Sequence, residues 1–421
     1  MNKVKLGDIA DVQLGKMLDA KKNKGEYHPY LANVHVRWGE FDTNNLPFMR
    51  FEENEKERFS LRNGDLVMCE GGEPGRCAIW RNQLPNVYYQ KALHRIRPHE
   101  DIADARWLYY WFLLQGRIGG LKKYFVETTI KHLVGEDLKR VEIDLPSFKQ
   151  QKAVADALSA LDDKITLNKQ MMAELEATAR LIYDYWFTQF DFPDENGNPY
   201  RSSGGKMTHN KTLNREIPAG WEVVRIGNLF SLQKGYSYSS EELSSVSDNP
   251  MISLASIDRK RNYREEELKY LRNDAKTDRV AYPGDLLIAC TDLTRNADIV
   301  GSPIFVPDEH AKYIFSMDLA KIQTLSSSVT PSYLYEVLRT DWFHNFIKGH
   351  TSGTNVIHLD VAGFNWFKVA LPPICLQQQY SKLHLRIIEK QNQCRREMAE
   401  LAALRNWLLP MLMNGQVNTN G

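Results

Sequence analysis

The hydrophobic residues between positions 146 and 190 recur in alternating steps of three and four. This heptad spacing predicts one long helix with a single apolar seam, which is interrupted by Asn168. Ser147 and Gln150, directly after Pro146, have the spacing of a capping box and predict where the helix begins. About forty residues at about 1.5 Å each give a rod of roughly 60 Å, too long for one more helix on a small domain. We therefore expect a coiled-coil helix with the seam Leu158, Leu161, Ile165, Met172, Leu175, Ala179, Ile182 and Trp186.

A second long helix is predicted over residues 372–415, between two prolines and an Asn-Gly pair. Its heptad is less regular, so the helix either drifts in register or uses Ile388 and Leu404 as well. Asn168 in the first helix either fixes the register of the pair or is exposed to water. The expected seam is Ile387, Met398, Leu401, Leu408 and Leu412, and the residues that interrupt it are Gln391, Cys394 and Arg405.

The two halves of the chain repeat each other. Early matches have a residue offset of 220, and later matches have an offset of 226, which implies about six inserted residues in the second copy. His132 and His358 match, and we interpret both as structural hydrogen-bonding residues rather than as catalytic bases. The matching segments are 4–15 with 224–235, 64–68 with 284–288, 128–133 with 354–359, Gln151 with Gln377, and 172–175 with 398–401.

Each copy begins with strands and helices of mixed character and ends in its long helix. Strand-like runs at residues 65–69 and 285–289 follow Gly-Asp turns. Apolar helical segments are expected at residues 107–114 and 333–338, and Thr330 followed by proline supplies an N-cap for the second. The predicted fold class is therefore α+β, divided into residues 1–145, a helix at 146–190, a flexible linker within 191–220, a second mixed domain at 221–371 and a helix at 372–415.

The composition is that of a folded protein in which positive and negative charges nearly balance. The 421 residues include 54 Lys and Arg against 53 Asp and Glu, a formal charge of +1, which excludes a histone-like or polyacidic protein. No apolar run reaches the roughly 18 to 20 residues of a membrane span, and the N-terminus lacks a signal-peptide pattern, so we expect a cytoplasmic protein. Five cysteines without a C-x-x-C pair support neither a disulfide framework nor a zinc ribbon.

The sequence lacks the common catalytic motifs. Residues 70–75 do not have the G-x-G-x-x-G spacing and are interpreted as a tight turn, and Gly-Gly-Lys at 204–206 is not a phosphate loop. Zinc hydrolase, deaminase, esterase and amino-methyltransferase patterns are missing. Asp258 with Glu267 and Lys269 resembles a metal-dependent nuclease triad, but the segment is charge-rich and fits a solvated surface better. We therefore expect no catalytic residue and no metal site on this chain.

Polar and aromatic residues near turns recur at corresponding places in the two copies. Arginine can read guanine and asparagine can read adenine, while lysines bind phosphate. Any one of these side chains is more often a solvated loop residue, and the recurrence is what favours a DNA contact. The candidate DNA-binding residues are Lys16, Lys21, Lys22, Asn33, His35, Arg37, Arg76, Thr129, Lys131, Lys234, Tyr236, Tyr238, Ser256, Arg259, Lys260, Arg261, Arg295, Asn296, Thr354 and Asn355.

This layout resembles the specificity subunit of type I restriction-modification enzymes over nearly the whole chain. Leu-Gly-Asp at residues 6–8 and Ile-Gly-Asn at 226–228 open the two domains, and Leu-Pro-Pro at 371–373 precedes the second helix. The two Gly-Asp-Leu strands, Gly-Thr-Asn-Val-Ile-His-Leu at 353–359 and the linker at 190–205 also look like that family. The order of these patterns is more specific than any one of them.

The resemblance implies two target recognition domains and an antiparallel coiled coil of the two helices, related by a pseudo-two-fold internal repeat. Each domain is expected to read one half of a bipartite asymmetric site in double-stranded DNA. The helices are expected to set the gap and to dock two methyltransferase subunits, and restriction subunits through them. S-adenosylmethionine and ATP are then expected on those partners, with no cofactor, no catalytic residue and no membrane contact for this chain.

Two other functions fit the same residues. A self-contained nuclease or methyltransferase with diverged motifs would bind S-adenosylmethionine or cleave DNA with a metal as an isolated chain. A coiled-coil adaptor would use its globular domains to bind protein, and a salt-sensitive shift of duplex DNA would argue against it.

Overall fold

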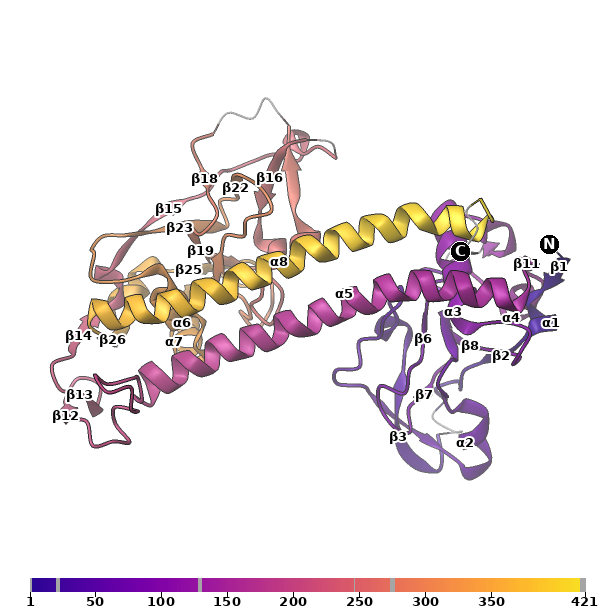
Figure 1. Ribbon diagram of the computed structural model, residues 1–421, viewed down its shortest axis with the longest axis horizontal. Coiled ribbons are helices and arrows are strands. Elements are labelled where there is room, and N and C mark those ends of the chain that lie inside the picture. Colours follow the sequence, from indigo (N-terminus) through magenta and orange to yellow (C-terminus); the bar gives the residue numbers. More distant parts are fainter. Residues whose placement is uncertain (1, 20–22, 128–130, 246, 273–276, 417–421) are drawn as a thin grey trace. The chain divides into compact units, whose positions relative to one another are not determined.

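The computed structural model describes residues 2–19, 23–127, 131–245, 247–272 and 277–416. The chain divides into two compact units, Met1–Leu167 with Met398–Gly421, and Asn168–Glu397. The long helices α5 (Phe148–Tyr183) and α8 (Ile374–Met413) each contribute one segment to each unit (Figure 1). Each unit therefore combines one globular domain with a stretch of both helices.

The first unit is built on a four-stranded antiparallel sheet in the order β2-β8-β5-β6. Its strands are β2 (Ala10–Leu14), β8 (Leu93–Pro98), β5 (Leu66–Cys69) and β6 (Cys77–Ile79). The other strands are β4 (Phe48–Phe51), β3 (Glu26–Leu31) and β7 (Tyr88–Tyr89) in one sheet, β1 (Asn2–Lys5) with β11 (Glu142–Leu145), and β9 (Val126–Glu127) with β10 (Lys131–His132). The helices are α1 (Leu6–Ile9), α2 (Glu53–Phe59), α3 (Ala105–Ile118) and α4 (Gly135–Lys139), with 3-10 turns at Asn33–His35 and Lys122–Tyr124.

Strand β5 is apolar throughout because both of its faces are covered. Leu66 and Met68 belong to the core cluster that contains α3, whereas Val67 and Cys69 belong to the cluster beneath the second sheet. Successive side chains of a strand point to opposite faces, so all four are buried. This explains why the Gly-Asp-Leu strand shows no alternation in the sequence.

The second unit repeats this plan with the sheet order β15-β23-β19-β21. Its strands are β15 (Phe230–Lys234), β23 (Leu319–Thr324), β19 (Leu286–Ala289) and β21 (Pro303–Phe305). The other strands are β17 (Lys269–Leu271), β16 (Asn249–Ile252), β22 (Tyr313–Phe315) and β18 (Val280–Ala281) in one sheet, β20 (Thr291–Asp292), β25 (Ile357–Leu359) and β24 (Thr351–Ser352) in another, and the pairs β14 (Glu222–Arg225) with β26 (Lys368–Leu371) and β12 (Met207–Asn210) with β13 (Arg215–Pro218). The helices are α6 (Pro331–Arg339) and α7 (Asp341–Lys348), with a π-helical turn at Asp184–Thr188 and 3-10 turns at Ile226–Asn228, Ser240–Glu242, Leu254–Ser256, Glu265–Glu267 and Val361–Asn365.

The repeat extends to single hydrogen bonds. The Leu133 amide donates to the Glu70 carbonyl at 2.8 Å, and at the matching position the Leu359 amide donates to the Cys290 carbonyl at 2.9 Å. The Gly301 amide donates a hydrogen bond to the carbonyl of residue 289, as the Gly75 amide donates to the carbonyl of residue 69 in the first copy. The offset between matched residues is therefore 220 at Cys290 and 226 at Gly301. The six inserted residues of the second copy therefore lie in the loop between positions 290 and 301.

A buried glutamine joins each domain to its long helix. Gln151 accepts the Asp104 amide at 2.9 Å and donates to the carbonyls of Ile102 and Pro146 at 3.0 Å. Gln377 makes the same three bonds, to Thr330, Ser328 and Pro372, at 2.8 to 3.0 Å. Asp104 and Thr330 are the N-caps of α3 and α6, so each glutamine fixes one domain helix against the first turns of α5 or α8. We call these two groups the glutamine latches.

Within the second unit α5 and α8 run antiparallel. Met172 contacts Gln391 through a 3.4 Å hydrogen bond, while farther along α5 the Ala179 carbonyl accepts the Tyr380 hydroxyl at 3.4 Å. Asn168 is buried and donates to Glu397 at 2.9 Å, so its interpretation as a buried, paired seam residue is correct and its exposure to water is not observed. Gln391 and Cys394, which interrupt the predicted apolar seam, are buried between the helices as well.

In the first unit the helix segments pack through Leu158, Leu409 and Leu412, which share one core cluster. Arg405 lies in the seam and donates to Asp162 at 2.6 Å, and the Tyr110 hydroxyl donates to the same carboxylate at 2.7 Å. The suggestion that Leu404 completes the seam is wrong, because this side chain is 42% exposed. An arginine satisfied by a carboxylate replaces an apolar contact at this level.

The segment between the halves is folded rather than the flexible linker predicted from its Gly, Ser and Pro content. Phe192 stacks on Tyr200 at 4.6 Å and on Trp221 at 5.5 Å between ring centroids. Asp191 accepts the Ser202 amide at 2.7 Å, and β12 and β13 form a hairpin after it. The turn residues are present, but the aromatic residues between them bury enough surface to order the segment.

The glutamine latches lead to a stability prediction. Gln377→Ala leaves two carbonyls and one amide near α6 without their partner, so we expect the free energy of unfolding to fall by about 1 to 3 kcal/mol. Urea unfolding followed by circular dichroism measures this loss. Gln378→Ala is the control, because Gln378 is exposed on α8. An equal effect of the two substitutions would contradict a role for the latch.

Candidate nucleic-acid interface

In the first unit, the 3-10 turn Asn33–His35 leads into a tight turn at residues 37–40. His35 caps its own turn, since its Nδ1 accepts the Ala32 amide at 2.9 Å. Burial lowers the pKa of His35, so the ring is neutral near pH 7 and its proton lies on Nε2. Arg37 is exposed, and the amide of its backbone donates to Glu40 at 2.9 Å, which closes the turn.

Residues 70–76 form the tight turn expected from their sequence and lie against the first turn. Asn33 donates to the Gly71 carbonyl at 3.0 Å, and Arg76 donates to the Asn33 carbonyl at 3.3 Å and to Glu73 at 2.9 Å. Gly71 also pairs with His132 of β10, next to the exposed Lys131. The structure thus brings Asn33, Arg37, Arg76 and Lys131 to one surface, although the Asn33 amide and the Arg76 guanidinium already hold the loops together.

The other candidates of the first domain lie elsewhere. Lys16 is buried and its ammonium contacts Glu55 and the Arg50 carbonyl, so this side chain is not available for a DNA contact. Lys21, Lys22 and Thr129 are outside the described residues.

The second unit has the matching turn at residues 258–262. The Asp258 amide donates to the Asn262 carbonyl at 2.9 Å, and the Asp258 carboxylate accepts the amides of Lys260 and Asn262 at 2.8 Å each. This leaves Arg259 and Lys260 exposed at the tip. Ser256 corresponds to His35, is fully buried, and caps its turn by accepting the Ser253 amide at 3.2 Å, so its hydroxyl has a structural role.

Two further loops of the second unit emerge from the same end of one sheet. Asp292 is buried and accepts the amides of Thr294, Ile299 and Val300 at 2.6 to 2.9 Å, which shapes the inserted loop. Since Asp292 pairs with Ile357 in antiparallel register, the loop after β20 and the tip before β25 lie together. The exposed side chains that they carry are Arg295, Asn296, Thr354 and Asn355.

The tyrosines of the second unit are engaged within their own domain. The Tyr236 hydroxyl donates to Glu242 at 2.5 Å, and this bond lowers the pKa of Glu242. Tyr238 accepts a bond from Lys269 at 2.8 Å, while Lys234 is exposed. Asp258 accepts amides of its own turn, Glu267 pairs with Arg264 and Lys269 bonds to Tyr238, so the three side chains of the nuclease-like pattern are engaged with other partners.

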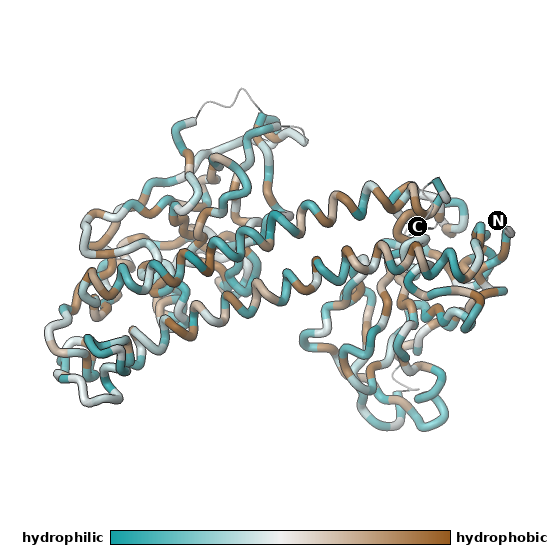
Figure 2. The backbone as a smooth tube through the Cα atoms, in the orientation of Figure 1, coloured by the Kyte–Doolittle hydropathy of each residue, from teal (hydrophilic) through white to brown (hydrophobic). Residues whose placement is uncertain are grey.

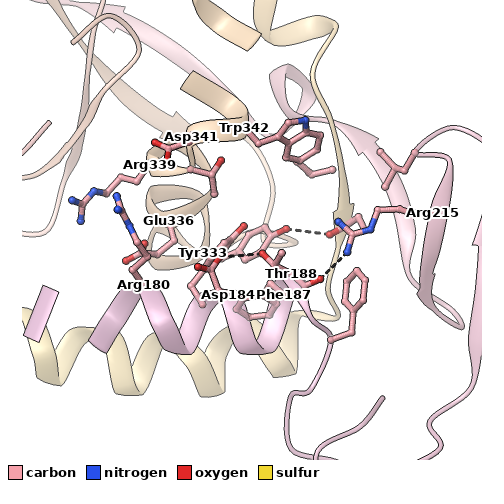
Figure 3. A pocket seen from close by; sticks show the side chains of 16 residues that line it. Arg180, Asp184, Phe187, Thr188, Arg215, Tyr333, Glu336, Arg339, Asp341 and Trp342 are labelled. Carbon is pink, nitrogen blue, oxygen red and sulfur yellow. Dashed lines mark hydrogen bonds between the residues drawn. The ribbon is translucent and has the colours of Figure 1, made fainter. Parts of the chain in front are cut away.

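Arg261 points back into the domain instead of joining Arg259 and Lys260. It forms an ion pair with Asp341 at the start of α7, and this bond lowers the pKa of Asp341. Arg339 donates to Asn262 from the end of α6. Arg339 and Asp341 line a cavity of about 520 Å³ with Arg180 and Asp184 of the α5 end (Figure 3). Sequence reasoning missed Arg339 and Asp341 as the residues that hold this turn. The Asp-x-x-x-Asn spacing indicated the turn itself but not its partners on α6 and α7.

The described part of the chain contains no group of three or more His, Cys, Asp or Glu side chains arranged to hold a metal ion. No helix in that part combines the length and apolarity needed to cross a bilayer. Among the candidates in the described residues, the exposed side chains are Arg37 and Lys131 in the first unit, and Lys234, Arg259, Lys260, Arg295, Asn296, Thr354 and Asn355 in the second.

Residues 1–177 and 218–392 match the family described as Type I restriction modification DNA specificity domain. The chain belongs to this family. One match falls on each copy of the repeat, which confirms the resemblance and the α+β fold with two recognition domains and long helices. The family's description as a DNA specificity domain supports the expected role in DNA recognition.

The relatives agree with this assignment. The chain is similar to the type I restriction enzyme MjaIX specificity subunit of Methanocaldococcus jannaschii, at 29% identity over 43% of this chain and 39% of that relative, well under two thirds of its length. Similarity to the HindI specificity subunit of Haemophilus influenzae is 20% and covers 98% of this chain and all of the relative. The crystal structure of the type I S subunit from M. genitalium covers 98% of this chain and 95% of its own, with a TM-score of 0.56 at 16% identity, which shows the shared fold.

The exposed arginines at the two matching turns are the most direct test of base reading. Arg37→Ala or Arg259→Ala is expected to relax one base position at a cost of about 1 to 3 kcal/mol, if the guanidinium makes a bidentate base contact. Binding of the assembled complex to cognate duplexes and to single-base variants measures this. Equal weakening on all sequences would instead mark a phosphate contact. Arg62→Ala is the control, because Arg62 is an exposed arginine paired with Glu57 elsewhere in the first unit.

Proposed function

We propose that this chain is the subunit of a type I restriction-modification complex that selects a bipartite, asymmetric DNA site. The domain at residues 1–145 would read one half and the domain at residues 221–371 the other. The observation that carries the proposal is the duplication: two copies of one scaffold, matched to single hydrogen bonds, bear different exposed side chains on corresponding loops. One scaffold that carries different side chains at corresponding positions suits recognition of two different half-sites.

The spacer helices, residues 146–190 and 372–415, would set the gap and dock two methyltransferase subunits. Apolar residues occur along both helices (Figure 2), and some of their side chains are exposed. In this proposal the methyltransferase subunits cover these residues. They are Leu167, Leu181, Leu383, Leu385, Leu404 and Trp407. Restriction subunits would join through the methyltransferases, and S-adenosylmethionine and ATP would be bound by these partners.

Exchange of one domain tests the division of labour. Replacing residues 1–145 with the equivalent domain of a relative is expected to change one half of the target and to leave the other half and the gap intact. Methylation-site sequencing of DNA from cells that express the chimera with its methyltransferase gives the result. If both halves change together, the two domains do not read separate sites. Cleavage or methylation by the isolated chain would favour the enzyme alternative.

Helix length gives a second test. Inserting one heptad at matched points near Asn168 and Cys394 keeps the seam and lengthens the helix pair by about 10.5 Å. At about 3.4 Å per base pair, we expect the gap to grow by about 2 to 3 bp, with weaker binding because the second half-site also rotates by roughly 100°. Methylation-site mapping measures the gap.

The control for this experiment is the same seven residues inserted in the exposed turn between β12 and β13, which should leave the gap unchanged. An active heptad variant with the original gap would show that the helices do not set the spacing.

A further inference from the structure

The two short helices α6 and α7 contact the turn at residues 258–262, which exposes Arg259 and Lys260. Arg261 has a left-handed backbone, with φ of +67°, and pairs with Asp341 of α7. The Asn262 side-chain oxygen accepts a hydrogen bond from Arg339 of α6 at 3.1 Å. The direction of the two exposed side chains therefore depends on what holds Asn262 and Arg261.

Arg339 carries the turn's attachment onward to the long helix. Its side chain is 4% exposed and forms an ion pair with Glu176 of α5. A guanidinium is planar and has donors on separate nitrogens, so one arginine can serve a carboxylate on one side and an amide oxygen on the other. A polar path thus runs from α5 through Arg339 to Asn262.

Helix α8 supports the same turn through Tyr263, the residue directly after Asn262. Tyr263 pairs with Ile257 to close the turn, and the Arg395 guanidinium lies 5.7 Å from the centre of the Tyr263 ring. Arg395 also lies 3.9 Å from the carboxylate of Glu309, which is 8% exposed. Helix α5 therefore reaches the turn through Arg339, and helix α8 contacts Tyr263, the residue directly after the turn.

The first copy anchors its turn differently. There Trp38 packs against Gly116 of α3, where a Cβ would come within 2.6 Å of the ring, and donates to Glu73 at 2.8 Å. At the offset of 226, the position of Arg339 is occupied by the buried Leu113. The Glu176–Arg339–Asn262 path is accordingly a property of the second copy.

We propose that Arg339 is a positioning residue for recognition of the second half of the target. By holding Asn262 while paired with Glu176, it makes the orientation of Arg259 and Lys260 depend on α5, a helix that contacts no base itself in this scheme. The inference rests on the proposed function, because it assumes that the turn meets DNA. It goes beyond that function in assigning base selectivity of one half-site to a contact with the spacer helix.

The test uses the complete complex with its methyltransferase and measures methylation rates on duplexes with the cognate site or with single-base changes in either half. Arg339→Met removes both contacts, whereas Asn262→Ala removes the bond from Arg339 and the 3.4 Å bond from Asn262 to Asp258, and leaves the Glu176 ion pair in place. For both we expect the ratio of cognate to changed-base rates in the second half to fall roughly 10-fold at one or more positions. The ratios for the first half should stay the same.

Two variants serve as comparisons. Asn262→Asp loses the same bond to Asp258 as Asn262→Ala but keeps an acceptor for Arg339, and it is expected to restore most of the preference lost in Asn262→Ala. Arg201→Gln removes another ion pair of the same unit, with Glu216 in the segment between the two halves, and is expected to leave both halves unchanged. Thermal midpoints are recorded for every variant, and if Arg339→Met does not assemble, Asn262→Ala and Asn262→Asp carry the test.

Lower thermal midpoints with unchanged base preference would show that Arg339 only stabilises the domain and would overturn the proposal. Equal loss of preference in both halves would overturn it too. A wild-type complex without any sequence-dependent methylation would instead contradict the proposed function on which the inference rests.

Discussion

The attachment of each recognition domain to its long helix depends on one buried side chain. Gln151 and Gln377 are both fully buried, and each bonds to one amide and one carbonyl at the start of a domain helix and to one carbonyl directly before its long helix. A glutamine amide has an acceptor and two donor hydrogens in a fixed plane, so it can close this junction without a charge in the core. The latches bond to the N-cap residues of α3 and α6. They therefore fix how the core of each domain is oriented on α5 or α8.

The two copies share this scaffold and differ in their solvent-exposed loops. The second copy has six more residues in the loop after Cys290, organised by the buried Asp292. Its turn at 258–262 is anchored by ion pairs and amides, whereas the turn at 37–40 is anchored by Trp38. Loops can change length and anchoring at little cost to the sheet beneath them. This is how one duplicated scaffold can present two different reading surfaces.

The helix pair tolerates polar residues in its seam because each one finds a partner. Asn168 bonds to Glu397, Gln391 bonds to the Met172 carbonyl, and Arg405 bonds to Asp162. A purely apolar seam would pack equally well in several registers, whereas these pairs are satisfied in one. The weak heptad of the second helix thus reflects a polar seam rather than a poor coil.

The sequence by itself determined the repeat, the two long helices and the two strands that follow Gly-Asp turns, because periodicity and turn residues act over short distances. It placed the capping box of Ser147, the N-cap at Thr330 and the Gly-Asp strands correctly. Only the tertiary structure decided which polar residues face outward. Lys16, Ser256 and Arg261 look like surface readers in the sequence, yet each is bound inside its domain by a residue that is distant in the chain or hidden in a turn. Partners such as Glu176 for Arg339 lie more than a hundred residues apart, and no local pattern encodes a contact that exists only after the helices and domain have packed.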